Sequence, residues 1–261
     1  MNGQGVLCNR SVWECPNTGV WFTVPSLTKA EIDALYRFEY SGQARLNPNS
    51  PRISAQFSYV KDFILENANY ARTTGERTKF NFLEIGCASG YLLKKLAPYA
   101  TELTCFEPSP HFATAAEELL LANNTDLPTR VFPSNWNAEL IAPSSVDVFL
   151  SSHVLEHIPD LCTFFSELFE KMKPGGAVFS EVPNHNTEYI ATTFGGQFHV
   201  TLFDARGWIL MMENSGFQLM HLTKTGENEL ATPNGIRMRS IFTKPRHPAQ
   251  DKVADFKGMG W

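Results

Sequence analysis

The chain has 261 residues, of which 43% are hydrophobic and 19% are charged, and its formal net charge is −5. This composition is ordinary for a globular enzyme, and the length is sufficient to bury a substantial core. The acidic balance disfavours nucleic acid as a partner. Because no apolar run reaches about eighteen residues, we also expect no membrane-spanning helix.

The N-terminal residues Met-Asn-Gly-Gln-Gly contain neither a basic nor an apolar signal region, so we expect a cytoplasmic protein. The five cysteines show no paired spacing. This pattern predicts free thiols in a reducing compartment.

Residues 1–75 are predicted to form a small N-terminal extension, followed by the main domain at 76–245 and a tail at 246–261. Thr28 and Glu31 have the spacing of a capping box at the start of a helix. Apolar residues at helical spacing indicate two helices, with Ile32, Leu35 and Phe38 in the first and Phe57, Val60 and Ile64 in the second. These helices either form a lid over the substrate end of the sheet or cover an edge of the core.

Residues 80–90 read Phe-Asn-Phe-Leu-Glu-Ile-Gly-Cys-Ala-Ser-Gly. The apolar run predicts a buried parallel strand, the glycines Gly86 and Gly90 a turn, and Tyr91 to Leu96 a helix. Gly86 would let the backbone approach a ligand closely, and the helix would present free N–H groups to it. The same small residues also suit the packing of any strand–turn–helix crossing, so this motif alone does not establish a cofactor site.

Residues 103–107 predict a second strand that ends in Glu107, and Pro108 terminates it. A carboxylate at the tip of the second strand, about twenty residues after the first glycine, can accept hydrogen bonds from both hydroxyls of a ribose. A glutamate at a strand end is common, but its pairing with the first motif at this spacing favours a ribose contact.

Further strands are predicted at 130–132, 217–222 and 236–243. A helix is expected from Asp204 to Ser215, with Gly216 in the left-handed cap position. Residues 184–200 are polar, and we expect a loop there with Gly195 and Gly196 as its hinge.

Four segments resemble, in the right order, the motifs of the class I S-adenosylmethionine-dependent methyltransferases: 83–90, 106–109, 146–158 and 173–184. The resemblance covers residues 79–243. It implies an α/β fold in which a doubly wound, mostly parallel seven-stranded sheet has helices on both faces and a last antiparallel strand. The turn at 173–176 would lead into the fifth strand.

The resemblance also implies S-adenosylmethionine as the cofactor and a set of residues that bind it. Glu84 suits the ammonium group of the methionine end, and Asn135 and Trp136 fall where the family contacts adenine, although Trp136 could equally be a core aromatic. Ala88 stands where the family often has glycine, which narrows the clearance without removing binding. The full set of expected cofactor contacts is Glu84, Gly86, Cys87, Ala88, Gly90, Glu107, Pro108, Asn135, Trp136 and Ser152.

Methyl transfer needs a general base only when the acceptor is a neutral hydroxyl or a protonated amine. Histidine suits this task near neutral pH, and the candidates are His153, His185 and His199. His199 is the first choice because it lies in the loop expected to close over the acceptor. His157 is interpreted as a packed structural residue, and Glu181 and Asn184 are additional acceptor-side candidates.

The N-terminal segment is similar to the zinc ribbon of some small-molecule methyltransferases. A tetrahedral zinc site needs four ligands, whereas only Cys8 and Cys15 are available and Thr18 stands where a second thiolate is required. We therefore interpret the ribbon as degenerate and expect no bound metal.

Three functions compete at this point. The leading one is methyl transfer to a small-molecule acceptor such as a sugar or natural product, preferably onto oxygen. An NAD-dependent oxidoreductase would also suit the glycine turn and Glu107, but Ala88 and the helix expected at Glu156 and His157 disfavour it. A non-catalytic cofactor-binding scaffold is the third, and a homodimer is left open.

Overall fold

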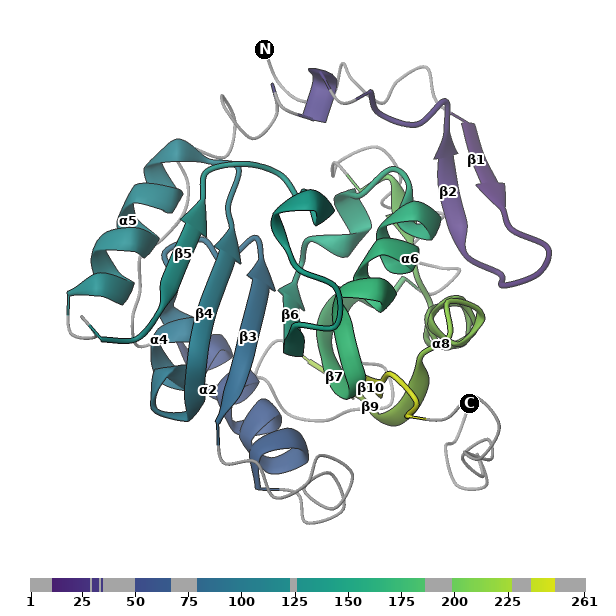
Figure 1. The fold of residues 1–261 in the computed structure, drawn as a ribbon. Coiled ribbons are helices and arrows are strands. Elements are labelled where there is room, and N and C mark those ends of the chain that lie inside the picture. Colours follow the sequence, from purple (N-terminus) through teal and green to yellow (C-terminus); the bar gives the residue numbers. More distant parts are fainter. Residues whose placement is uncertain are drawn as a thin grey trace.

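The computed structural model describes residues 11–28, 30–32, 34, 50–66, 79–122, 126–185, 199–226 and 236–246. Two sheets organise these residues (Figure 1). The larger has seven strands in the order β5-β4-β3-β6-β7-β10-β9, and the smaller has three in the order β1-β2-β8. The larger sheet carries most of the core.

The seven-stranded sheet is parallel through its first five strands, and β10 pairs antiparallel with both β7 and β9. This confirms the predicted fold class and the antiparallel last strand. The strands are β3 (Phe80–Ile85), β4 (Ala100–Phe106), β5 (Thr129–Phe132), β6 (Val146–Ser152), β7 (Met172–Pro183), β9 (Gln218–Thr225) and β10 (Arg237–Thr243).

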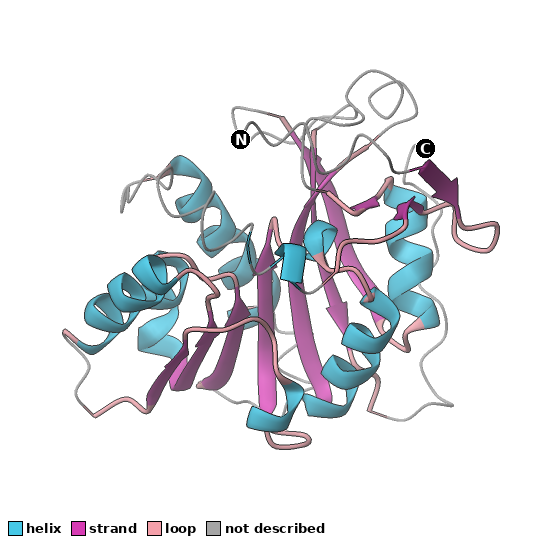
Figure 2. Ribbon diagram, turned by 90° about the horizontal axis from the view of Figure 1, so that it is seen from above, coloured by secondary structure: helices cyan, strands magenta, loops and turns pink. Residues whose placement is uncertain are grey.

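Helices cover both faces of this sheet (Figure 2). One face carries α2 (Pro51–Val60), η3 (Lys61–Leu65), α4 (Tyr91–Leu96), η4 (Ala97–Tyr99) and α5 (Pro110–Leu121). The other carries α6 (Leu161–Lys171) and α8 (Ala205–Asn214), and short turns η5 (Ala138–Leu140) and η6 (Leu155–His157) connect the strands. Alternation along β3 explains the two layers, because Phe82 packs into the α4 side and Leu83 into the α6 side.

Local signals set several helix ends as expected. The Asp204 carboxylate accepts a hydrogen bond from Gly207 N–H at the start of α8, and Gly216 has φ +91° just after its end. The predicted capping box is also present, since Thr28 N–H donates to Glu31 Oε2 at 2.7 Å. Residues 30–32 and 34 are helical, but Leu35, Phe38 and the hinge at Gly195 and Gly196 lie outside the described residues.

The second predicted helix corresponds to α2 and η3. Val60 and Ile64 are buried in the core shared with α4, so the helix covers the sheet. At its N-terminal end, however, Arg52 lines the cavity described below. The first predicted helix contributes Ile32 to the same cavity.

The N-terminal segment forms an antiparallel hairpin of β1 (Ser11–Glu14) and β2 (Trp21–Val24). Strand β2 also pairs with β8 (Thr201–Leu202), so residues far apart in sequence share the small sheet at the upper right of Figure 1. In the hairpin turn, Cys15 C=O accepts from Gly19 N–H at 2.7 Å, and the Thr18 hydroxyl lowers the pKa of the Cys15 thiol. Thr18 therefore lies beside the Cys15 sulfur.

Residues 173–176, predicted as a turn, belong instead to β7, which begins at Met172. Gly175 N–H donates to Lys244 C=O at 2.8 Å, and Lys244 N–H donates to Gly176 C=O at 2.9 Å. The segment is an irregular part of the strand, since Gly175 has φ +81° and the register between β6 and β7 shifts here.

The prediction of free thiols is wrong for two cysteines, because Cys87 and Cys105 form a disulfide with Cα atoms 6.1 Å apart. Cys87 follows β3 and Cys105 lies in β4, and parallel pairing of these strands brings the two together. Cys15 and Cys162 are free, and Cys8 lies outside the described residues. Among the described residues, no helix has the length and the apolar character needed to cross a membrane.

Candidate functional site

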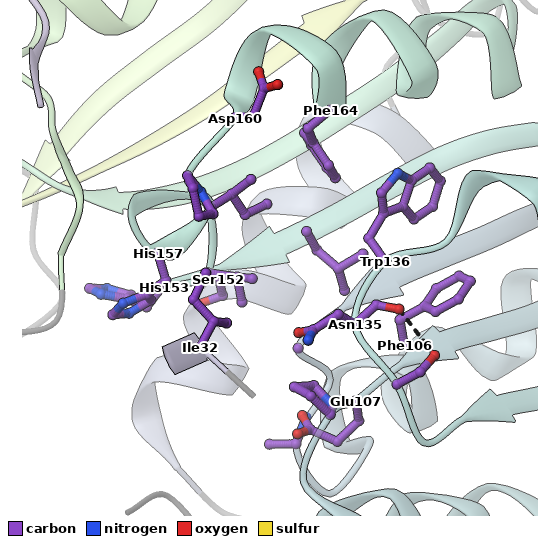
Figure 3. Close-up of a pocket in the computed structure, with 18 of the residues that line it drawn as sticks. Ile32, Phe106, Glu107, Asn135, Trp136, Ser152, His153, His157, Asp160 and Phe164 are labelled. Atoms are coloured by element: carbon purple, nitrogen blue, oxygen red, sulfur yellow. Dashed lines mark hydrogen bonds between the residues drawn. The ribbon is translucent and has the colours of Figure 1, made fainter. Parts of the chain in front are cut away.

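A cavity of about 920 Å³ opens at the carboxyl ends of β3, β4 and β6. In an open parallel sheet this is where ligands bind, at the point where the strand order reverses. Figure 3 shows His153 and His157 at one end of the cavity and Phe106 and Trp136 at the other. Its size lies within the range of ligand pockets, which is about 300 to 1,000 Å³.

The turn after β3 forms the floor of the cavity and needs glycine at its first position. Gly86 has φ +63°, and a Cβ added there would lie 2.3 Å from Val154 Cγ2. Ala88 lies in the same turn at φ +46°, a conformation that L-residues rarely adopt. Gly90, at φ +75°, caps α4 and packs against Ala116.

Glu107 connects the two predicted motifs. Its Oε2 accepts a hydrogen bond from Ala88 N–H and its Oε1 from Ser109 N–H, both at 2.9 Å. The side chain is buried yet lines the cavity. Burial raises the pKa of the Glu107 carboxyl, while the two backbone donors oppose that shift.

Glu84 lies below the turn and does not line the cavity. Burial, followed by the nearby charge of Glu107, raises the pKa of the Glu84 carboxyl to about 8. Its Oε2 has no hydrogen-bond partner among the residues that the structure describes. The contact to the cofactor ammonium predicted for Glu84 therefore stays a prediction.

Aromatic residues form one end of the cavity. Phe106 stacks on Phe132 with ring centroids 4.8 Å apart, and Trp136 meets Phe106 edge-on at 5.4 Å. The Trp136 indole N–H donates to Glu167 Oε2 at 2.7 Å, which fixes the ring. Asn135 lines the cavity beside it. This end offers a flat apolar surface with polar groups at its edge, as a purine base requires.

The opposite end contains His153 between two carboxylates. His153 Nδ1 lies 3.2 Å from Glu156 Oε1, and Nε2 lies 3.4 Å from Glu181 Oε1. Burial lowers the pKa of His153, but the two glutamates outweigh it and raise the pKa above its usual value. His153 lines the cavity and has φ +54°, so it occupies a strained backbone position at the tip of β6.

His185 and His199 lie behind this wall and do not line the cavity. Their rings touch, with His199 Nδ1 3.3 Å from His185 Nε2. Burial is the main reason that the pKa of His185 falls to about 4 and that of His199 to about 3. A base with so low a pKa accepts protons poorly, so the structure favours His153 over His199 for that task.

A polar network connects α2 to the same end of the cavity. Arg52 donates to Glu181 Oε1 at 2.7 Å through Nε and to Ser152 Oγ at 2.8 Å through Nη2. Gln56 donates to both of these acceptors, and Arg239 holds the other oxygen of Glu181. Sequence reasoning missed Arg52, because no motif surrounds it in the sequence.

Most of the predicted cofactor contacts are gathered around the one cavity. Those that line it are Gly86, Ala88, Glu107, Pro108, Asn135, Trp136 and Ser152. Glu84, Cys87 and Gly90 lie beneath them, where Cys87 is in the disulfide and Gly90 caps α4. Lining residues without a sequence signal include Phe112, Asp160, Thr163 and Glu167.

Comparison with known sequences shows relatives of one enzyme class. A family model described as methyltransferase domain matches residues 53–222. Ubiquinone biosynthesis O-methyltransferase of Pseudomonas entomophila (strain L48) is 26% identical over 117 residues, which cover 44% of this chain and 50% of the relative. The enzyme of that name from Chelativorans sp. (strain BNC1) is 26% identical over 195 residues, which cover 70% of this chain and 76% of the relative. The chain spans about half the length of the first curated relatives.

Comparison with solved structures shows the same fold. Magnesium protoporphyrin IX methyltransferase from Synechocystis PCC 6803, solved with bound SAH, superposes with a TM-score of 0.58 at 11% identity, covering 83% of this chain and all of that one. The matched family region begins in α2, beyond the N-terminal hairpin, and the resemblance of that hairpin to a zinc ribbon is not supported. Because the match extends from α2 into β9 and takes in every strand that borders the cavity, the chain belongs to the methyltransferase domain family, whose enzymes use S-adenosylmethionine.

Proposed function

We propose that this chain transfers a methyl group from S-adenosylmethionine to an oxygen of a small-molecule acceptor. The observation that carries the proposal is a single cavity whose one end is aromatic and whose other end presents His153 and Arg52. When bound, S-adenosylmethionine supplies an electrophilic methyl group on a sulfonium.

The residues of the first two motifs fit this cofactor. Each oxygen of Glu107 already accepts one backbone N–H, which leaves lone pairs for two further donors such as the hydroxyls of a ribose. Asn135 and Trp136 lie where a purine would be held, and Gly86 and Ala88 form the floor between the two ends. These residues bind and orient, which is the main contribution that an in-line displacement needs.

We assign to His153 the role of the general base that takes the proton from the acceptor hydroxyl. It lines the cavity, and the carboxylates of Glu156 and Glu181 hold its ring from two sides. His199, the first choice from the sequence, lies behind the wall with a side chain only 11% exposed. Arg52 and Ser152 lie beside His153 and would orient a polar acceptor.

The relatives named as O-methyltransferases support oxygen as the receiving atom. The family assignment disfavours the NAD-dependent alternative. The scaffold alternative and the homodimer stay predictions.

Calorimetric titration with S-adenosylhomocysteine and with NAD tests the cofactor. We expect binding of the former and no heat from the latter, and binding of NAD alone would refute the assignment. A panel of phenols, sugars, carboxylic acids and amines, incubated with the enzyme and S-adenosylmethionine, tests the acceptor by mass spectrometry. We expect a gain of one methyl group on a hydroxyl-bearing compound, whereas methylation of amines alone would remove oxygen as the receiving atom.

A further inference from the structure

Behind His153 lies a second cluster of side chains, of which the proposed reaction uses only Glu156, as a support for the His153 ring. Glu156, His157 and His199 each offer one ligand atom, and these three atoms all lie within 4.8 Å of one another. Glu156 and His157 belong to η6, whereas His199 directly precedes the segment that contains β8. His157 also lines the cavity, so the cluster adjoins the acceptor end.

The Glu156 carboxylate is the unusual member of this cluster. Its side chain is fully buried, and neither oxygen has a hydrogen-bond partner among the described residues. The nearby ring nitrogens are His153 Nδ1 at 3.2 Å and His199 Nε2 at 3.9 Å, and both distances are to Oε1. A protonated His153 would balance the charge at Oε1 but would leave Oε2 unpaired. A buried carboxylate in that state is strongly unfavourable unless a cation accompanies it.

The orientation of His199 is that of a ligand. Its Nδ1 lies 3.3 Å from His185 Nε2, which leaves Nε2 directed to Glu156. Histidines that bind metals characteristically bond their second ring nitrogen to a neighbouring group, because this fixes the ring and its tautomer.

Backbone hydrogen bonds hold the two halves of the cluster together. Val200 N–H donates to Glu156 C=O at 2.8 Å, and Val200 C=O accepts from Thr23 N–H at 2.9 Å. The backbone contacts of Val200 with η6 and β2 therefore place His199 next to Glu156, without any contribution from a contact between the two side chains.

We propose that Glu156, His157 and His199 bind a divalent cation of the zinc class. One carboxylate and two imidazoles form a donor set that suits zinc, and three protein ligands leave a coordination position open for water or an acceptor atom. The site is distinct from the N-terminal turn at Cys15, where the sequence predicts no metal, and it departs from the expectation that the chain binds none. It goes beyond the proposed methyl transfer and does not depend on it.

The first test uses the full chain, stripped with a chelator, reloaded with zinc chloride and dialysed. Elemental analysis should give about one zinc per chain, and replacement by cobalt should produce visible absorption bands typical of tetrahedral or five-coordinate ligation. Zinc should also raise the melting temperature, because a ligand that binds only the folded state stabilises it. A wild-type chain that retains no zinc and shows no cobalt bands overturns the proposal, whatever the variants do.

Variants then locate the metal. Glu156→Gln and His199→Ala should each weaken zinc binding on the order of a hundredfold, and both should lose the zinc-dependent rise in melting temperature. His111→Ala, an exposed histidine on α5, is the matched control and should bind as the wild type does. If Glu156→Gln does not fold, the partly exposed His199 decides alone. Loss of zinc in Cys15→Ser with normal binding in His199→Ala would place the metal at the N-terminal turn and refute the site.

Discussion

Replacement of Glu107 by glutamine separates the two tasks that the structure gives this carboxylate. The wild-type oxygens accept from Ala88 N–H and Ser109 N–H at 2.9 Å, whereas an amide has one accepting oxygen and would turn its NH₂ group towards the other donor. Leaving one buried donor unpaired should lower the free energy of unfolding by about 1–3 kcal/mol.

Cofactor affinity should fall at the same time. The lone pairs that remain on Glu107 are the ones we assign to two ribose hydroxyls, and glutamine keeps a neutral acceptor on one side only. Loss of charge-assisted bonds of this kind should weaken binding by about 2 kcal/mol, which corresponds to a roughly thirtyfold higher Kd. Urea denaturation without ligand measures the first effect, and calorimetric titration with S-adenosylhomocysteine measures the second.

Glu117→Gln removes the same charge from an exposed position on α5 and should change neither quantity. A lower stability with a Kd within about threefold of the wild type would mean that Glu107 only fastens the turn to β4. An unchanged stability would contradict the hydrogen bonds themselves.

Three other substitutions test separate parts of the argument. His153→Gln should lower turnover on a hydroxyl acceptor by roughly a hundredfold while the Kd for S-adenosylhomocysteine stays constant, and an equal effect on both would place His153 in the cofactor site. In the folded chain the Glu84 carboxyl has a pKa of about 8, whereas in the unfolded chain its pKa is the ordinary value for glutamate. The unfolded chain therefore loses this proton at lower pH, so the free energy of unfolding of the wild type should fall as the pH rises from the ordinary pKa to about 8. Urea denaturation between pH 4.5 and pH 8 should show this loss, of up to about 5 kcal/mol, in the wild type but not in Glu84→Gln. If the free energies of unfolding of the two proteins change with pH in parallel, the raised pKa of Glu84 is refuted. Gly86→Ala should destabilise the fold by about 1–3 kcal/mol in urea denaturation, because its Cβ would meet Val154 at 2.3 Å, and a neutral result would mean that Val154 moves freely.

The sequence predicted the elements whose causes are local. The buried strand at 80–85, the helix that begins at Asp204 and the left-handed Gly216 each depend on a few neighbouring residues, and the structure confirms all three. The expected chain order of motifs placed Glu107 beside Gly86 because parallel strands end at one edge of a sheet.

Features that depend on contacts between distant segments were not predictable in this way. The Cys87–Cys105 disulfide arises from the register between β3 and β4, and their spacing along the chain gives no sign of it. Arg52 reaches the cavity only because α2 packs next to β7, and His199 is withdrawn from the cavity because β8 pairs with β2. Such pairings are tertiary events that no window of sequence encodes.

The pairing of β2 with β8 has a kinetic consequence. Thr23 and Val200 are 177 positions apart in the chain, so their contact closes a loop that encloses most of the large sheet. Closing so long a loop becomes favourable only after the intervening strands have condensed, which makes this one of the last native contacts to form. Pulsed hydrogen exchange during refolding should therefore show protection of the Thr23 amide well after that of the amides in β3 and β6. The segment around His199 would then take its place only after the turn that follows β3 has formed the floor of the cavity.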